Sequence, residues 1–255
     1  MSNISIDYGN WVPKNLLYAL LGIIIIISTL SIIPMLLIFN IILWILDGLF
    51  IVGLLFLYYL YRMFAHNNGE MQKKLRNIVL QNLPWNGKGK VLDIGTGSGY
   101  LAIQLAKTNP KTEAWGIDYW GKGWNYSLKM CEENAKIEGV ENRTTFQKAS
   151  ASDLPFNNEE FDAIVSNFVF HEVRSVKDKF LLFKEALRVL KKGGVFSIQD
   201  PIKRERHFGE LNVLKEKLRK LGVEEVNYLD TLEELNMPTL ARVAFRNSGI
   251  IFGRK

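Results

Sequence analysis

Three glycines at alternate positions, Gly95, Gly97 and Gly99, are the residues of this chain best placed to surround a ligand. They directly follow a short apolar segment and directly precede a helix-forming one. Glycine lets the backbone turn sharply and approach a ligand that a Cβ atom would repel. About twenty residues further on, a second apolar segment ends in Asp118, whose carboxylate can accept hydrogen bonds from both hydroxyls of a ribose. These features predict a site for a nucleoside-containing cofactor.

The spacing of the glycines separates two classes of cofactor. Dinucleotide-binding loops have the pattern G-x-G-x-x-G, in which the third glycine packs the helix against the strand. That third position is Tyr100 here, and the additional glycine comes one residue earlier, which disfavours an NAD-linked reductase. The pattern Asp93-x-Gly95-x-Gly97-x-Gly99 instead resembles the nucleotide-binding loop of class I S-adenosylmethionine-dependent methyltransferases.

The elements that must position these residues alternate between strand and helix. We predict strands over residues 90–94, 114–118, 144–148, 161–166, 195–199, 223–228 and 250–254. Helical patterns cover residues 70–83, 101–107, 126–137, 180–191 and 206–221, and the 230–249 segment has a mixed pattern. Such alternation gives a parallel sheet with right-handed crossovers, and ligands bind at the carboxyl ends of its strands. The predicted fold class is α/β, a Rossmann-like, mostly parallel seven-stranded sheet with helices on both faces, preceded by two transmembrane helices.

The resemblance extends beyond the glycine loop. It is carried by the segments 91–99, 116–118, 151–156 followed by 161–165, and 187–194. The chain looks like the broad class I family that includes the ubiquinone and menaquinone biosynthesis C-methyltransferases. The likeness covers residues 75–199 and continues more loosely to the C-terminus. It implies S-adenosylmethionine as cofactor, S-adenosylhomocysteine as product, and a late hairpin that adds an antiparallel strand to the sheet edge.

The resemblance also implies which residues contact the cofactor. Those residues are Asp93, Gly95, Thr96, Gly97, Gly99, Asp118, Tyr119, Ser152, Asp153, Leu154 and Asn167. Asp93 would face the amino group of the methionine part. Asp118 would bind the ribose hydroxyls, with Tyr119 beside the adenine. Asp153 would bind the adenine amino group, and Leu154 would offer its backbone. Taken singly, Asp93 also fits a plain strand-end acid, and Ser152–Asp153 an ordinary turn or helix cap.

His171 is the candidate catalytic residue. A methyltransferase acting on phenols, enols or quinol carbons must remove a proton, and a histidine is the usual base. His171 follows the predicted strand 161–166, where it would face the acceptor side of the cofactor. Lining of the acceptor pocket and local hydrogen bonding are the alternative roles. The same segment keeps Asn167 but lacks the Asn-Pro-Pro-Tyr run typical of methyltransferases that act on amino groups of bases or glutamine.

The N-terminal region is predicted to be a membrane hairpin. Between Asn15 and Tyr61 the only charged residue is Asp47. One membrane span needs about 20 residues, so this length fits two spans and a turn. We place the spans at about 16–37 and 41–61, with Phe39–Asn40 at the turn. The region is longer than the apolar part of a signal peptide, and a core helix that is apolar on all sides over this length is unusual.

The predicted domains are a tail over residues 1–14, the hairpin over 15–61 and the methyltransferase domain over 62–255. Basic residues flank both hairpin ends, with Lys14 before it and Arg62 after it, which predicts a two-pass protein with its catalytic domain on the cytoplasmic side. From Arg62 on the chain has 31 basic and 24 acidic residues, a net charge of +7, which suits an anionic lipid surface. No block of basic residues with interleaved aromatics points to nucleic acid. The single cysteine, Cys131, excludes a disulfide framework and a cysteine-based metal cage, and we predict no metal.

These features predict a membrane-anchored enzyme that transfers a methyl group from S-adenosylmethionine to a small-molecule acceptor. A domain tethered to the bilayer is best placed for a lipophilic acceptor, such as a quinol or a lipid. One alternative is a cofactor-binding sensor or scaffold with a degenerate methyltransferase domain. Another is methylation of a protein partner held at the membrane.

Overall fold

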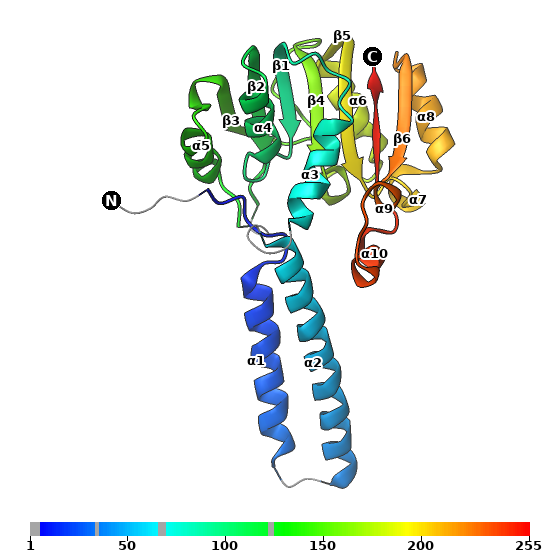
Figure 1. Cartoon of the computed structure of the whole chain (residues 1–255). Helices are drawn as coiled ribbons and strands as arrows, with labels where there is room; N and C mark the ends of the chain where they lie inside the picture. The colour runs from blue at the N-terminus through cyan, green and yellow to red at the C-terminus, as the bar shows by residue number, and fades with distance from the viewer. Residues whose placement is uncertain (1–5, 34–35, 66–69, 122–124) are drawn as a thin grey trace. The chain divides into compact units, whose positions relative to one another are not determined.

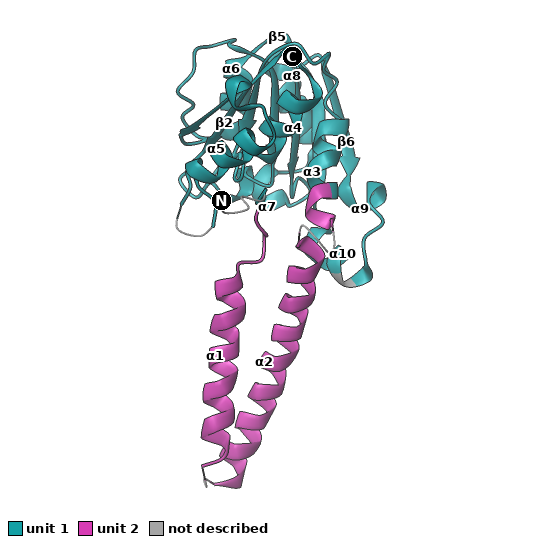
Figure 2. Cartoon of the chain, turned by 60° about the vertical axis from the view of Figure 1, so that its left-hand side comes forward, with its two compact units in different colours: residues 1–8, 74–255 teal, residues 9–73 magenta. Residues whose placement is uncertain are grey.

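The computed structural model describes residues 6–33, 36–65, 70–121 and 125–255. The chain divides into two compact units, shown in teal and magenta in Figure 2. Unit 1 comprises Met1–Tyr8 and Lys74–Lys255, and unit 2 comprises Gly9–Lys73. The segment 6–8, predicted to belong to a tail, is therefore part of the larger unit, which the hairpin interrupts.

Unit 1 is built on a seven-stranded sheet with the order β3-β2-β1-β4-β5-β7-β6 (Figure 1). The strands are β1 (Gly89–Ile94), β2 (Thr112–Asp118), β3 (Thr144–Lys148), β4 (Phe161–Asn167), β5 (Leu190–Asp200), β6 (Glu225–Asp230) and β7 (Gly249–Arg254). The pairs from β3 to β5 are all parallel, whereas β7 is antiparallel to both of its neighbours. The predicted mostly parallel sheet is confirmed.

Helices connect these strands. They are α3 (Met71–Gln81), α4 (Tyr100–Thr108), α5 (Leu128–Ile137), α6 (Phe180–Val189), α7 (Glu205–Phe208), α8 (Leu211–Lys220), α9 (Thr231–Glu234) and α10 (Thr239–Phe245), with short 3₁₀ turns η1 (Glu141–Arg143) and η2 (Phe170–Glu172). Successive side chains of a strand point to opposite faces of a sheet. Leu92 accordingly joins one buried cluster with Leu182 of α6, and Val91 joins the other with Ile103 of α4. The sheet thus has a packed core on each face.

Three predicted elements of unit 1 need correction. The antiparallel strand β7 lies between β5 and β6, and not at the edge, because β6 pairs with its outer side. The predicted helix over 206–221 is two helices, α7 and α8, separated at Gly209, whose φ of +71° ends the first. The helix predicted over 180–191 stops at Val189, because Leu190 begins β5 by pairing with Phe161 of β4.

Unit 2 contains the helices α1 (Lys14–Ser31) and α2 (Leu37–Phe64). Both are long and apolar enough to cross a membrane by length and composition alone. At about 1.5 Å per residue they span roughly 27 Å and 42 Å. Phe39 and Asn40, predicted to form the turn, lie inside α2, so the connection comes earlier in the chain. Pro34 lies between the two helices in the sequence, and a proline disfavours continuation of a helix through it.

Asp47 is paired within unit 2. The hydroxyl of Ser28 on α1 donates a hydrogen bond to Asp47 Oδ2 on α2 (2.8 Å). The carboxyl of Asp47 therefore has a partner between the two helices, and this bond ties the middle of α2 to α1.

Candidate cofactor and acceptor site

The adjoining carboxyl ends of β1 and β2 form the cofactor loop, which we define as residues 95–99. Ile94 pairs with Ile117 in parallel register. The next two amides of the chain, those of Gly95 and Thr96, both donate to the carbonyl of Ile117 (2.8 and 2.9 Å). The loop therefore turns away from the sheet while it remains attached to the end of β2.

Gly95 is required for close packing between the loop and the segment after β4. Its φ is +73°, in the left-handed region, and a Cβ atom there would lie 2.1 Å from Cγ2 of Val169. Val169 immediately precedes η2, which carries His171. The absence of a side chain at Gly95 thus brings the His171 segment directly against the cofactor loop.

Asp93 is buried beneath the loop, with 1% of its surface exposed. Its Oδ2 accepts hydrogen bonds from the Thr96 hydroxyl (2.6 Å) and the Ala102 amide (3.3 Å). Burial raises the pKa of Asp93 to about 7, against the lowering effect of the bond from Thr96. Its other oxygen, Oδ1, has no hydrogen-bond partner among the described residues. An unpartnered buried carboxylate oxygen fits the ammonium group of a bound amino-acid moiety.

Asp118 is bonded to the same loop. Its Oδ2 accepts from the Gly97 amide (2.9 Å), and its Oδ1 accepts from the Trp120 amide (2.7 Å). Burial raises the pKa of Asp118, and these amides oppose the shift. The carbonyl of Gly97 accepts from the indole Nε1 of Trp120 (2.9 Å) and from the Cys131 thiol (3.2 Å). The structure therefore brings Asp93, Thr96, Gly97 and Asp118 into one hydrogen-bonded loop.

The side chains predicted for the adenine end have other surroundings. Tyr119 is 67% exposed, and the Lys148 ammonium lies 5.1 Å from its ring centroid. The Ser152 hydroxyl lies 2.8 Å from the Ser150 hydroxyl, and Asp153 is exposed. The Leu154 amide donates to a carboxylate oxygen of Glu185 on α6 (2.8 Å). That amide is therefore already engaged, and it stabilises the turn after β3.

The carboxylate of Asp200 orients His171, the candidate base. His171 Nδ1 donates to Asp200 Oδ1 at the end of β5 (2.7 Å), and its Nε2 lies 3.3 Å from Glu172 Oε1. Asp200 is fully buried and also accepts from the backbone amides of Val169, Phe170 and His171. Burial disfavours the imidazolium, but the bonds to Asp200 and Glu172 outweigh burial and raise the pKa of His171 to about 9.

Asn167, at the end of β4, belongs to a different network. Its side-chain amide donates to Gln199 Oε1 (2.6 Å), and Gln199 in turn donates to the Thr231 hydroxyl (2.9 Å). The next residue, Phe168, has a φ of +57° and packs its ring on Phe245 of α10 at 5.6 Å. His171 lies 6.4 Å from Phe168 between ring centroids, so three aromatic rings gather after β4.

Sequence reasoning missed three contributors to this site. Asp200 ends β5, and its position after an apolar strand was the available signal. Trp120 is bonded to both Asp118 and Gly97, but its role depends on a turn that no motif marks. Arg76 on α3 is 7% exposed and close enough to Asp93 to lower the pKa of that carboxyl. In the sequence Arg76 resembles any cation of an amphipathic helix.

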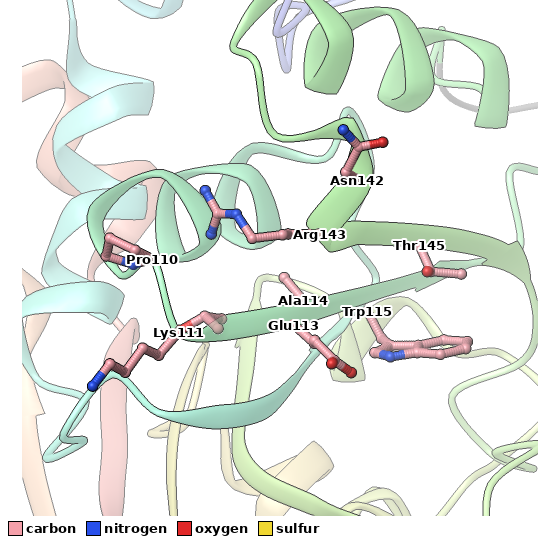
Figure 3. A pocket seen from close by; sticks show the side chains of 9 residues that line it. Pro110, Lys111, Glu113, Ala114, Trp115, Asn142, Arg143 and Thr145 are labelled. Atoms are coloured by element: carbon pink, nitrogen blue, oxygen red, sulfur yellow. The ribbon is translucent and has the colours of Figure 1, made fainter.

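A pocket of about 330 Å³ lies elsewhere on unit 1 (Figure 3). It is lined by residues 110–115 and by Asn142, Arg143 and Thr145. These residues belong to the amino-terminal parts of β2 and β3 and to the turns before them, whereas the cofactor loop adjoins the carboxyl end of β2. None of the predicted site residues lines this pocket.

The strand order, the cofactor loop and the paired acids define a class I S-adenosylmethionine-dependent methyltransferase. Residues 86–239 match the profile of a family described as a methyltransferase domain, and the chain belongs to that family.

Individual proteins show the same likeness. The chain is 28% identical over 125 residues to the ubiquinone/menaquinone biosynthesis C-methyltransferase UbiE of Geotalea daltonii. The aligned part is 49% of this chain and 50% of that protein. The chain is 37% identical over 107 residues to the demethylmenaquinone methyltransferase of Roseiflexus castenholzii, with 42% and 40% covered. The chain thus spans about half the length or less of these relatives.

A solved structure shares the fold. It is phosphoethanolamine N-methyltransferase 2 of Haemonchus contortus in complex with S-adenosyl-L-methionine, with a TM-score of 0.54 and 18% identity. The match covers 76% of this chain and 55% of that chain.

Proposed function

We propose that this protein is a membrane-anchored methyltransferase that transfers the methyl group of S-adenosylmethionine to a lipophilic small molecule, such as a quinol or a lipid. The observation that carries the proposal is the placement of an Asp200–His171 pair directly beside the cofactor loop. The two apolar helices support a membrane location. The relatives named for quinone biosynthesis support a lipophilic acceptor.

Residues of the cofactor loop would hold the methionine and ribose parts of the cofactor. Asp93 Oδ1 would accept from the ammonium group, and Gly95, Gly97 and Gly99 let the backbone approach the ligand closely. Asp118 would use its remaining lone pairs for the ribose hydroxyls, because a carboxylate has about four acceptor positions and backbone amides take only some of them here. The sulfonium supplies an activated methyl group when the cofactor is bound.

For the adenine end we propose Tyr119, Ser152 and Asp153, whose side chains reach the surface after β2 and β3. Asp153 would accept from the adenine amino group. Leu154 would act indirectly, because its amide is held by Glu185 and so positions the preceding residues. Asn167 would contribute from the end of β4 with its orientation set by Gln199.

His171 would remove the proton that the acceptor loses on methylation. With Nδ1 donating to Asp200, Nε2 would be the atom that accepts the proton, after its contact with Glu172 Oε1 (3.3 Å) is given up. A raised pKa means that the imidazolium predominates at neutral pH, so only the deprotonated fraction acts as base. The aromatic side chains of Phe168 and Phe245 would line the path of an apolar acceptor and exclude water from it.

The test of this function uses the full chain in its membrane and S-adenosylmethionine carrying a labelled methyl group. Extracted membrane lipids and cytosolic extract from the same cells are offered separately as acceptors. We expect label in the lipid extract, and loss of that label in an Asp118→Ala variant that lacks the ribose carboxylate. Label confined to the cytosolic small molecules would refute the lipophilic acceptor. Label confined to protein would support the protein-partner alternative instead.

A further inference from the structure

The segment 6–8, which precedes the hairpin, is packed into unit 1. We call this segment the strap. Tyr8 is 4% exposed, and its ring meets the ring of Tyr100 edge-on at 4.9 Å. Its hydroxyl donates to Glu138 Oε1 at the end of α5 (3.2 Å). Tyr8 is therefore a core residue of unit 1, although the whole of unit 2 (Gly9–Lys73) separates it in the chain from the rest of unit 1.

The backbone of the strap is bound by buried side chains. The Asp7 amide donates to Asn134 Oδ1 (3.1 Å), and Asn134 Nδ2 donates back to the Asp7 carbonyl (2.8 Å). This reciprocal pair uses both polar groups of the asparagine amide. It resembles the pair of backbone hydrogen bonds that two neighbouring strands exchange. Asn134 is 2% exposed, so water cannot replace the hydrogen bonds that its side chain makes to the strap.

The same side chains contact the cofactor loop. Ser98 lies between two of the loop glycines and is fully buried. Its hydroxyl donates to the Tyr8 carbonyl (3.1 Å), and its own carbonyl accepts from Asn134 Nδ2 (3.0 Å). The hydroxyl of Ser98 is thus bonded to the strap, and its carbonyl is bonded to Asn134, which also binds the strap. The hydroxyl of Ser98 points to the strap and is not available to a ligand.

The strap also contacts a residue that lies shortly after the hairpin in the chain. Arg76, which follows the hairpin in the chain, donates from both terminal guanidinium nitrogens to the Tyr8 carbonyl (3.4 Å each). The residues before and after the inserted helices therefore meet at one carbonyl group, beside Ser98. A loop flanked by glycines has many accessible conformations, and contacts that select one of them favour ligand binding.

We propose that residues 6–8 are positioning residues of the cofactor site, which hold Ser98 and hence the cofactor loop in the conformation that binds S-adenosylmethionine. This proposal rests on the proposed methyltransferase function. In this proposal the strap influences the reaction only indirectly. It acts through the hydrogen bonds to Ser98 and Asn134, so its loss raises the KM for the cofactor and leaves kcat at saturating cofactor unchanged.

The test compares Asp7→Pro with Asp7→Ala in the full chain. Both variants lose the carboxylate, but only proline loses the amide that bonds to Asn134. We expect S-adenosylmethionine to bind about tenfold more weakly to D7P than to D7A, because buried partners are left unpaired. Calorimetric titration measures the dissociation constants, and thermal unfolding without ligand reports whether each variant is folded. Equal affinities of the two folded variants would overturn the proposal.

A second variant tests the route through Ser98. Ser98→Ala removes the bond to the Tyr8 carbonyl without altering the strap, and we expect several-fold weaker cofactor binding. If the strap acts through Ser98, D7P weakens cofactor binding by a smaller factor in the S98A background than in the wild-type chain. Fully additive effects, or an unchanged affinity in S98A, would contradict the proposal. S98A alone provides the test if D7P does not fold.

Hydrogen exchange separates this proposal from the proposed function. In ligand-free protein, D7P should accelerate exchange at the amides of residues 95–99 more than at the β4 and β5 amides. If the protein bound no S-adenosylmethionine, the methyltransferase function would fail, whereas this measurement would still show whether the strap orders the loop. Unchanged exchange in the loop would overturn the strap proposal in either case.

Discussion

At the scale of single residues, the His171–Asp200 pair would determine the chemistry on the acceptor side of the proposed site. Asp200 accepts three backbone amides as well as the imidazole, so its charge is held rigidly in place. A carboxylate so placed fixes which ring nitrogen carries the proton and stabilises the imidazolium. His171 is thereby oriented, and Nε2, which lies 3.3 Å from Glu172 Oε1, would be the nitrogen that takes part in proton transfer.

Replacing His171 by Asn tests its role as base. We expect cofactor affinity to stay within twofold, since His171 is not among the proposed cofactor ligands, and turnover to fall roughly a hundredfold or more. In the wild-type enzyme turnover should rise with pH and level off above about pH 9, because the base must be deprotonated. In H171N this rise should disappear. Unchanged turnover in H171N would remove the base role.

At the scale of elements, the loop between β1 and α4 depends on the segment between β4 and η2. Gly95 and Val169 come from neighbouring strands of the sheet, and the missing side chain of Gly95 allows their contact. The cofactor loop and the His171 segment therefore pack as one unit, and a change in one displaces the other.

Gly95→Ala should demonstrate this dependence, with Gly139→Ala as its matched control. Both glycines have a positive φ, +73° and +69°, but a Cβ at Gly139 would meet nothing within 4 Å. The control therefore measures the conformational cost alone, about 1–2 kcal/mol. We expect G95A to lower the free energy of unfolding by more than G139A does, and to weaken cofactor binding at least tenfold. Denaturant unfolding and calorimetry measure both; equal losses in the two variants would contradict the packing role of Gly95.

At the scale of the whole molecule, the proposed membrane hairpin would place the catalytic unit where apolar acceptors dissolve. The two helices have the length and composition for spanning, and Asp47 finds its partner within the pair. Basic residues at both ends of the hairpin favour the cytoplasm for the catalytic unit. The enzyme would then draw a cytosolic cofactor and a membrane-dissolved acceptor to one site.

Cysteine accessibility in intact cells tests this topology. Cys131 is fully buried, so it should react little with a membrane-impermeant maleimide. We expect Ser31→Cys, at the end of α1, to be labelled in intact cells. Lys220→Cys, at the end of α8, should be labelled only after lysis. Labelling of K220C in intact cells would reverse the orientation, and equal labelling of both sites after lysis alone would argue against a spanning hairpin.

Several features of this protein were determined by the sequence alone. Glycine spacing and the acid after the second strand indicate the cofactor class, because a backbone that must approach a ligand constrains residue types locally. Strand and helix periodicities predict the mostly parallel sheet, and apolar length predicts two long helices. Such properties depend on neighbours within a few residues of one another, so they can be read along the chain.

Only the tertiary structure decided how distant residues meet. The partner of His171 lies 29 residues away in Asp200, and the strap meets Asn134 across 127 residues. The Leu154 amide, expected at the adenine, is taken by Glu185, which no local pattern around Leu154 indicates. The place of β7 inside the sheet likewise follows from its long-range pairing with both β5 and β6. The packing of the whole chain determines which groups become hydrogen-bond partners, and the spacing of residues along the sequence does not reveal these pairs.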